Sequence, residues 1–335
     1  RRQRQMCIRD RYIFLAVAGI LVLSAFKSEQ KVRIFMIGDS TMANKDVSGG
    51  KLERGWGMML KNFFTDNVIV NNHALNGRSS KSFIAEGHWQ KVVEQIRPGD
   101  YVFIQFGHND EKADTLRHTD PGTSFDDNLR RFVNETRLKG GIPVLFNSVV
   151  RRTFADSKTA VEDDDKRDNS SNYLAEGDTL VDTHGAYLLS PRNVAVELDV
   201  PFVDANKITH DLEEGLGPDG SKKLHMWYRP GEVEYLPDGR QDNTHYNVYG
   251  AYIVAGLLAE AVADEVPELK DYFRHYDMSV ANDGSGLYFD LQSAIDAADP
   301  GSSVTILVGD GEWAKPSIPK NKKIKFVLSA GAKWL

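Results

Sequence analysis

Short apolar runs rich in β-branched and aromatic residues alternate along this chain with segments of helical periodicity. The runs at residues 32–37, 68–70, 101–106, 143–148 and 201–203 are predicted strands. Residues 56–64, 89–96 and 125–139 place apolar side chains three and four positions apart, which is typical of one face of a helix. Residues 247–266 form a last predicted helix. Because strand–helix alternation favours a parallel sheet covered on both faces, we predict an α/β fold, a three-layer parallel sheet flanked by helices.

The composition excludes several classes of protein. Among 335 residues, 41 Lys and Arg stand against 48 Asp and Glu, a formal charge of −7. A nucleic-acid partner is disfavoured, because neutralising phosphates requires a basic surface. A hydrophobic content of 41% excludes disorder for most of the chain. Cys7 is the only cysteine, which rules out an intrachain disulfide and a cysteine-based metal site. The histidines show no metal-binding spacing, so we predict no metal and no cofactor.

The first 29 residues have the pattern of an export signal. Residues 1–11 contain five arginines, and residues 12–26 form an apolar run of 15. A membrane-spanning helix requires about 20 apolar residues, whereas a basic segment before a shorter apolar one is typical of a cleaved signal peptide. We predict a secreted or periplasmic protein with no stable membrane insertion after cleavage. An uncleaved N-terminal anchor is the alternative.

Polar residues follow the predicted strands at the edge where parallel sheets build ligand sites. Ser40 follows the first strand, Gly77 the second and Asn109 the third. Asp242 and His245 precede the last predicted helix, and the carboxylate of such a pair orients the imidazole. Each of these alone is explained by a turn or a helix cap. Together they supply a nucleophile, a base, an orienting acid and oxyanion donors, the roles that acyl transfer requires.

Four sequence blocks carry a resemblance to a known family. Gly38-Asp39-Ser40, Gly77, Gly107-x-Asn109-Asp110 and Asp242-x-x-His245 occur in the order found in SGNH (GDSL-type) hydrolases, which residues 31–270 resemble. The resemblance implies a flavodoxin-like sheet, a triad of Ser40, Asp242 and His245, and an oxyanion hole of Ser40, Gly77 and Asn109. The stretches 72–83 and 242–247 are similar to the rhamnogalacturonan acetylesterase branch, which removes acetyl groups from pectic polysaccharide. This similarity therefore implies a serine carbohydrate esterase that acts on this polymer through an acyl-enzyme.

Two other functions stay open. One is an acetyl esterase acting on another plant polysaccharide, such as xylan. The other is a carbohydrate-binding module without catalysis, although such a module has no need of all five site residues. A lipid ester is disfavoured, because no long apolar lid segment follows the leader. His73 and His108, by their place in the motifs, and Trp227, which can stack on a sugar ring, are candidate substrate contacts.

The composition changes after Tyr276, where Gly and Asp turns separate short β runs. The stretch 280–298 is similar to the opening of pectin methylesterases, which fold as right-handed parallel β-helices. The resemblance assigns no catalytic residue here. We predict an esterase domain at residues 30–276 and an incomplete β-helix segment at residues 277–335. Because its β runs have too few neighbours to close a β-helix, we expect this segment to pack loosely on the esterase domain and to be dispensable for acetyl-ester hydrolysis.

Overall fold

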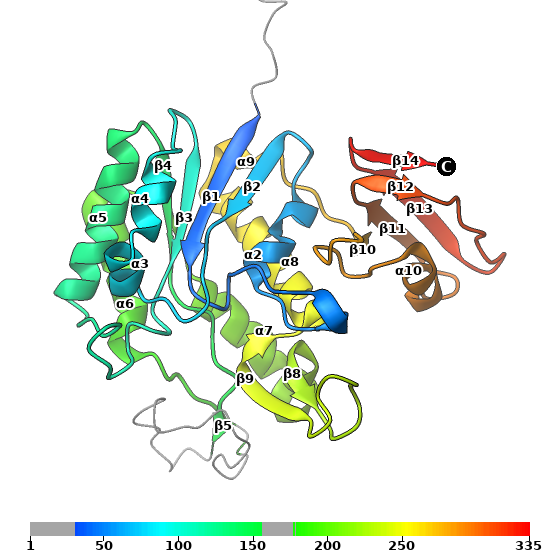
Figure 1. Ribbon diagram of the computed structural model, residues 1–335, viewed down its shortest axis with the longest axis horizontal. Helices are drawn as coiled ribbons and strands as arrows, with labels where there is room; N and C mark the ends of the chain where they lie inside the picture. The colour runs from blue at the N-terminus through cyan, green and yellow to red at the C-terminus, as the bar shows by residue number, and fades with distance from the viewer. Residues whose placement is uncertain (1–30, 156–176, 178) are drawn as a thin grey trace, which may run out of the picture.

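A five-stranded parallel sheet forms the centre of the molecule (Figure 1). The structure is a computed structural model that describes residues 31–155, 177 and 179–335, so the predicted leader and most of the polar segment 156–182 lie outside the described residues. The strands follow the order β2-β1-β3-β4-β7, the doubly wound arrangement of flavodoxin-like sheets. The predicted parallel sheet is confirmed, with these bounds: β1 Val32–Gly38, β2 Val68–Asn72, β3 Tyr101–Gln105, β4 Ile142–Phe146 and β7 Phe202–Val203.

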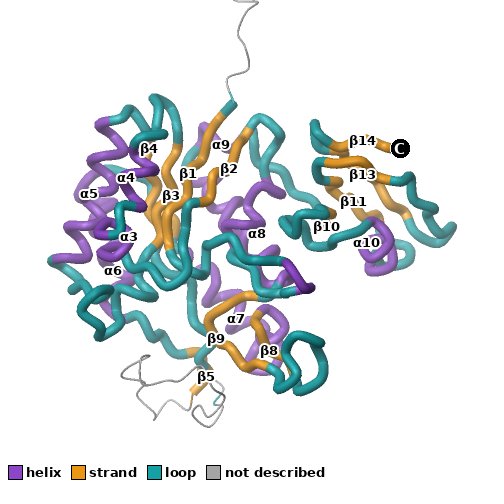
Figure 2. The backbone as a smooth tube through the Cα atoms, viewed as in Figure 1, coloured by secondary structure: helices purple, strands orange, loops and turns teal. Residues whose placement is uncertain are grey.

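Helices cover both faces of this sheet, because side chains on β1 alternate between two apolar cores. Ile34 and Met36 lie in the core beneath α2, α7 and α8, whereas Phe35 and Ile37 lie in the core beneath α3, α4, α5 and α6. The two helical layers flank the sheet in Figure 2. Their bounds are α2 Trp56–Met59, α3 Ser80–Ala85, α4 His88–Val93, α5 Ser124–Leu138, α6 Leu189–Leu198, α7 Ala205–Gly220 and α8 Val248–Glu265, with the short α9 at Pro267–Lys270. Among the described residues, no helix is both long and apolar enough to cross a bilayer.

A β-hairpin occupies the region before the last helix, where a helix cap would explain the Asp-x-x-His block taken alone. Strand β8 (His225–Tyr228) pairs antiparallel with β9 (Arg240–Tyr246), and Asp242 and His245 both lie on β9. The N-cap of α8 is Asn247, whose side chain accepts a hydrogen bond from the backbone of Gly250. The Asp-x-x-His block is therefore held by a paired strand and not by a helix cap. A second antiparallel pair joins β5 (Phe154–Ala155) to β6 (Thr179–Leu180).

The C-terminal residues form a separate small unit of parallel strands. Strands β10 (Met278–Val280), β11 (Ser303–Val308) and β13 (Lys323–Leu328) make one sheet, and β12 (Gly311–Trp313) and β14 (Ala332–Trp334) make another. The short helix α10 (Leu291–Ala297) covers them. The unit has its own apolar cluster, which includes Val280, Ile306 and Trp313.

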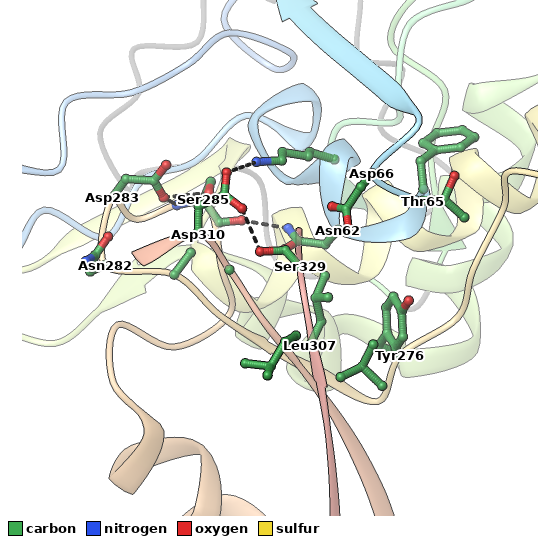
Figure 3. Close-up of a pocket in the computed structure, with 16 residues that line it drawn as sticks. Asn62, Thr65, Asp66, Tyr276, Asn282, Asp283, Ser285, Leu307, Asp310 and Ser329 are labelled. Carbon is green, nitrogen blue, oxygen red and sulfur yellow. Dashed lines mark hydrogen bonds and ion pairs between the residues drawn. The ribbon is translucent and has the colours of Figure 1, made fainter. Parts of the chain in front are cut away.

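The C-terminal segment, which we expect to pack loosely, is joined to the esterase fold by polar contacts of single side chains. The unit lies against the α8 side of the esterase fold in Figure 1, and the Nε of Arg54, which is only 1% exposed, donates to the carbonyl of Gly284 at 3.0 Å. The amide of Asn62 donates to Ser285 O at 2.6 Å, and Asp66 accepts from the backbone of Ala330 at 2.8 Å. These bonds use polar groups that apolar periodicity does not reveal. A cavity of about 190 Å³, lined by both polar and apolar side chains, remains between the two parts (Figure 3).

Candidate active site

A serine and a histidine–aspartate pair that are far apart in the sequence form one chain of hydrogen bonds. Ser40 lies just beyond the carboxyl end of β1, and His245 lies on β9. The His245 Nε2 atom is 2.9 Å from Ser40 Oγ, and His245 Nδ1 is 2.8 Å from Asp242 Oδ2. Asp242 is buried, whereas the side chain of His245 is 19% exposed. The arrangement allows the imidazole to take a proton from the serine while facing a carboxylate.

Asp242 is held in its ionised form. Burial alone would raise the pKa of its carboxyl, but hydrogen bonds from His245 and the charge of Arg240 lower that pKa below its ordinary value. Its Oδ1 accepts two backbone N–H groups, of Thr244 at 2.8 Å and of His245 at 2.9 Å. Its Oδ2 accepts from Arg240 Nη2 at 2.5 Å in addition to His245. Asp242 is thus fixed on both oxygens.

Arg240 is a site residue that the sequence patterns did not single out. It lies two positions before Asp242. Alternate residues of a strand share a face, so recognising β9 as a strand would have placed Arg240 beside Asp242. Its Nη1 donates to Glu53 Oε2 at 2.8 Å. Lys45 Nζ reaches Glu53 Oε1 at 2.8 Å and donates to Asn76 Oδ1 at 2.7 Å. This network joins the triad aspartate to the loop that carries Gly77.

The second and third sequence blocks lie side by side. Gly77 has φ +73°, a backbone conformation that favours glycine. Asn109, in the loop after β3, donates its amide to the carbonyl of Arg78 at 3.3 Å, and its Oδ1 accepts from Arg117 Nη1 at 3.3 Å. The structure therefore brings Gly77 and Asn109 close together. Their convergence with the Ser40 N–H on a single oxyanion stays a prediction.

Asp110 fixes the position of these two loops. This fully buried carboxylate accepts the backbone N–H of Ser80, at the start of α3, and the hydroxyls of Ser80 and Thr119. A negative charge is favourable at a helix N-terminus, yet burial raises the pKa of Asp110 to about 7 despite these donors. Asp110 ties the loop of Asn109 to the helix that follows Gly77.

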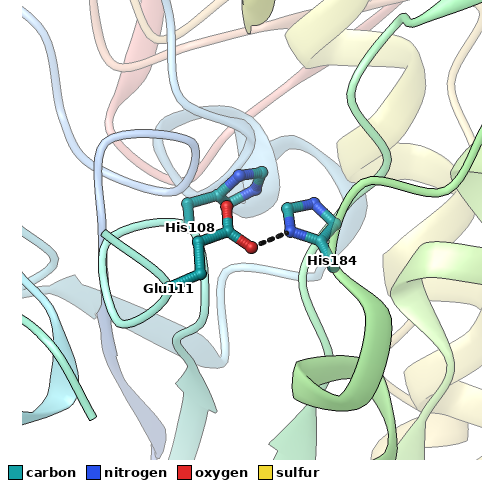
Figure 4. A group of neighbouring side chains, drawn as sticks. All are labelled: His108, Glu111 and His184. Carbon is teal, nitrogen blue, oxygen red and sulfur yellow. Dashed lines mark hydrogen bonds and ion pairs between the residues drawn. The ribbon is translucent and has the colours of Figure 1, made fainter. Parts of the chain in front are cut away.

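Figure 4 shows a second group of buried polar side chains. His108, Glu111 and His184 bring potential metal-ligand atoms within 4.8 Å of one another, although their sequence spacing did not predict it. Arg151 fills the same space: its Nη1 bonds Glu111 and lies 3.3 Å from His184 Nδ1, and its Nη2 donates to His108 O at 3.3 Å. A fixed guanidinium opposes a cation at this place, so these residues fit a buried ion-pair network better than a metal site.

The structure places the three candidate substrate contacts differently. His73 is half-buried and stacks on Phe35 with ring centroids 5.8 Å apart. His108 is 2% exposed and packs edge-on against His184. Its ring nitrogens are buried and have no hydrogen-bond partner among the described residues, and burial lowers its pKa well below the ordinary value. Trp227 is half-buried, donates its indole N–H to Asn243 Oδ1 at 2.9 Å and lies at the groove beside the β8–β9 hairpin.

A hydrogen-bonded serine, histidine and aspartate at the carboxyl edge of a flavodoxin-like sheet define a serine hydrolase with a doubly wound α/β fold. Residues 36–251 match the model of the GDSL-like Lipase/Acylhydrolase family, and the chain belongs to this family of carboxylic ester hydrolases. It is 37% identical over 244 residues to the rhamnogalacturonan acetylesterase RhgT of Bacillus subtilis (strain 168), covering 73% of this chain and 95% of that protein.

A second relative and a solved structure of similar fold also match this chain. The rhamnogalacturonan acetylesterase of Emericella nidulans is 27% identical over 76% of this chain and 94% of its own length. The crystal structure of the YxiM protein of Bacillus subtilis matches with a TM-score of 0.52 at 22% identity, over 70% of this chain and 56% of that longer one. The family match ends at residue 251, so none of these comparisons supports a pectin methylesterase domain at residues 277–335.

Proposed function

We propose that this protein is a serine esterase that removes acetyl groups from rhamnogalacturonan through an acyl-enzyme. The hydrogen-bond chain from Ser40 through His245 to Asp242 carries this proposal. The substrate rests on the identity to relatives that are named for this polymer.

In the proposed first step, Ser40 Oγ attacks the acetyl carbonyl carbon while His245 Nε2 takes the hydroxyl proton. The tetrahedral intermediate collapses when His245 returns that proton to the sugar oxygen, which leaves as an alcohol. A water then gives its proton to His245 and attacks the acyl-enzyme, and acetate departs from Ser40 as its oxygen is reprotonated. Asp242 stays ionised throughout and stabilises the imidazolium.

The oxyanion of both intermediates is assigned to the backbone N–H groups of Ser40 and Gly77 and the side-chain amide of Asn109. The contact between Asn109 and the carbonyl of Arg78 supports this set, because it holds the second and third blocks together. No step in this scheme needs a metal or a cofactor.

A groove of about 1030 Å³ beside the β8–β9 hairpin is the proposed binding surface for the polysaccharide chain. It is lined by Trp227, Tyr228 and Gln241 among others. Arg152 and Lys222 lie over the Trp227 ring at 4.8 and 5.0 Å from its centroid, so the indole also orients cations. His108 is too deeply buried to be assigned a direct contact with a sugar, whereas His73 stays a candidate.

Acetate release from acetylated rhamnogalacturonan and acetylated xylan tests the proposal. We expect preference for the first polymer, and Ser40→Ala should lower kcat on the order of 10⁴-fold or more while leaving the fold intact. Preference for xylan would overturn the proposed substrate but leave the proposed serine mechanism in place. Binding of either polymer with no acetate release by the wild type would favour a carbohydrate-binding module.

We also propose that residues 1–29 direct export and that residues 277–335 form the opening coils of a parallel β-helix. The leader proposal rests on its arginine cluster and 15-residue apolar run. Ser303 pairs with Lys323 and Gly311 with Ala332, offsets of 20 and 21 residues, and Trp313 lies opposite Trp334, which supports stacked coils. The exported protein should lack the leader by mass, and this chain should release no methanol from methylated pectin.

A further inference from the structure

A buried arginine forms the central contact between the C-terminal unit and the esterase fold. The guanidinium of Arg54 bonds three backbone carbonyls: Lys51 O and Glu53 O at 2.8 Å through Nη1, and Gly284 O at 3.0 Å through Nε. It lies 5.6 Å from the ring centroid of Phe289, and its Nη2 is buried with no hydrogen-bond partner in the part of the chain that the structure describes. Burial lowers the pKa of Arg54. The C-terminal unit thus supplies part of the environment that this buried cation requires.

The segment that carries Arg54 also contacts the catalytic strand. The backbone N–H of Arg54 donates to the carbonyl of Tyr246, the residue after His245, at 3.0 Å. Its neighbour Glu53 forms a backbone bridge with Asn247 and accepts from Arg240 at 2.8 Å. Arg240 in turn donates to the triad carboxylate of Asp242. A continuous set of bonds therefore runs from Gly284 through Arg54 and Glu53 to the aspartate that orients His245.

We propose that residues 281–289 are a positioning element of the esterase site, acting through Arg54 and the Glu53–Arg240 pair on Asp242. This inference rests on the proposed function, because it gives these residues a role in the reaction of the same triad. They touch neither substrate nor the reacting atoms. If the contact is lost, Arg54 keeps a buried charge with fewer partners, which is costly, and residues 51–54 shift to relieve it. The Glu53–Arg240 pair then moves, and Asp242 no longer holds the imidazole in its productive orientation.

Gly284 offers a sharp test with a matched control. It has φ +80°, and a Cβ there would lie 2.7 Å from Val47 Cγ1 and 3.2 Å from Arg54 Nη2. Gly301, in the same unit, has φ +89° and open space where a Cβ would lie. Alanine at either site meets the same backbone penalty, but only Gly284→Ala disturbs Arg54. For 4-nitrophenyl acetate, we expect Gly284→Ala to lower kcat about tenfold or more with little change in KM, and Gly301→Ala to keep the wild-type kcat.

Three milder variants decide the question if Gly284→Ala does not fold. Phe289 and Ile318 are 39% and 40% exposed in the C-terminal unit, but only Phe289 faces Arg54. We expect Phe289→Ala to lower kcat several-fold, Phe289→Tyr to restore it by keeping the ring, and Ile318→Ala to leave it unchanged. A loss of thermal stability in Phe289→Ala with a wild-type kcat would show a purely structural contact and overturn the inference.

Ser40→Ala in the same assay separates this inference from the proposed function. An active Ser40→Ala protein would overturn the serine mechanism itself. An inactive Ser40→Ala protein together with wild-type kcat in both Gly284→Ala and Phe289→Ala would overturn only the positioning role.

Discussion

Two adjacent carboxylates leave the loop after β3 in different directions and fix it from both sides. Asp110 accepts from Ser80 and Thr119, whereas Glu111 bonds Arg151 and His184. Burial would raise the pKa of Glu111, but the charges of His184 and Arg151 lower it below the ordinary value. Asn109, immediately before this pair, is therefore held by residues that have no direct part in the proposed chemistry.

The assignment of Asn109 to the oxyanion hole predicts a defect in rate and not in binding. Loss of one such donor costs about 10²–10³-fold in kcat, because the bond forms fully only in the transition state. We expect Asn109→Ala to show this fall with a KM close to that of the wild type, measured by acetate release. Asn321→Ala, at an exposed turn of the C-terminal unit, is the control. An unchanged kcat in Asn109→Ala would remove this amide from the oxyanion hole.

The raised pKa of Asp110 predicts how stability depends on pH. The folded protein holds the Asp110 proton up to about pH 7, whereas the unfolded chain releases it near pH 4. Between these values the folded state binds more protons, so the wild type loses stability as the pH rises. Asp110→Asn lacks this titration. We expect its free energy of unfolding, measured with urea, to rise relative to that of the wild type between pH 4 and pH 8. A difference between the two proteins that does not change with pH would contradict the raised pKa.

At the level of elements, the strands were predicted well because each is a run of buried apolar residues that ends in a polar block. Ser40, Gly77 and Asn109 could be placed at one edge for the same reason. The β8–β9 hairpin was missed because its residues are largely polar, and α7 because it contains Gly215, Gly217 and Pro218. His108 and His184 are 76 positions apart, and only the folded chain brings them together.

Close packing of α8 predicts opposite effects for two helical glycines. A Cβ on Gly250, in the first turn of α8, would lie 1.9 Å from the carbonyl oxygen of Leu224, whereas one on Gly215 in α7 would meet open space. We expect Gly250→Ala to lower the Tm, because α8 must move away from Leu224. Gly215→Ala should be neutral or stabilising by up to about 1 kcal/mol, since alanine favours the helix. A thermal melt of both variants checks this, and an unchanged Tm in Gly250→Ala would contradict the close approach.

At the scale of the whole molecule, the C-terminal unit is joined to the esterase fold by polar contacts. The sequence indicated short β runs in this unit, but not the contacts of Arg54, Asn62 and Asp66 across the boundary. Such contacts depend on single side chains that meet only after both parts have folded. The expectation that this segment is dispensable for acetyl-ester hydrolysis stays a prediction, and the positioning role proposed above predicts the opposite.

The strand β13 also bears on how the protein behaves at high concentration. Among the described residues it pairs on one side only, with β11, so its other side is a free edge capable of adding a strand from a second molecule. Lys323 and Lys325 are exposed along it and alternate with the half-buried Ile324 and Phe326. Like charges on two such edges repel each other over about 10 Å at 0.1 M salt and much less at 1 M. Light scattering should therefore detect more self-association as salt is raised. Lys325→Glu places a charge of opposite sign beside Lys323 and should make association less dependent on salt. A wild type that stays monomeric at every salt concentration would show that the edge is protected in another way.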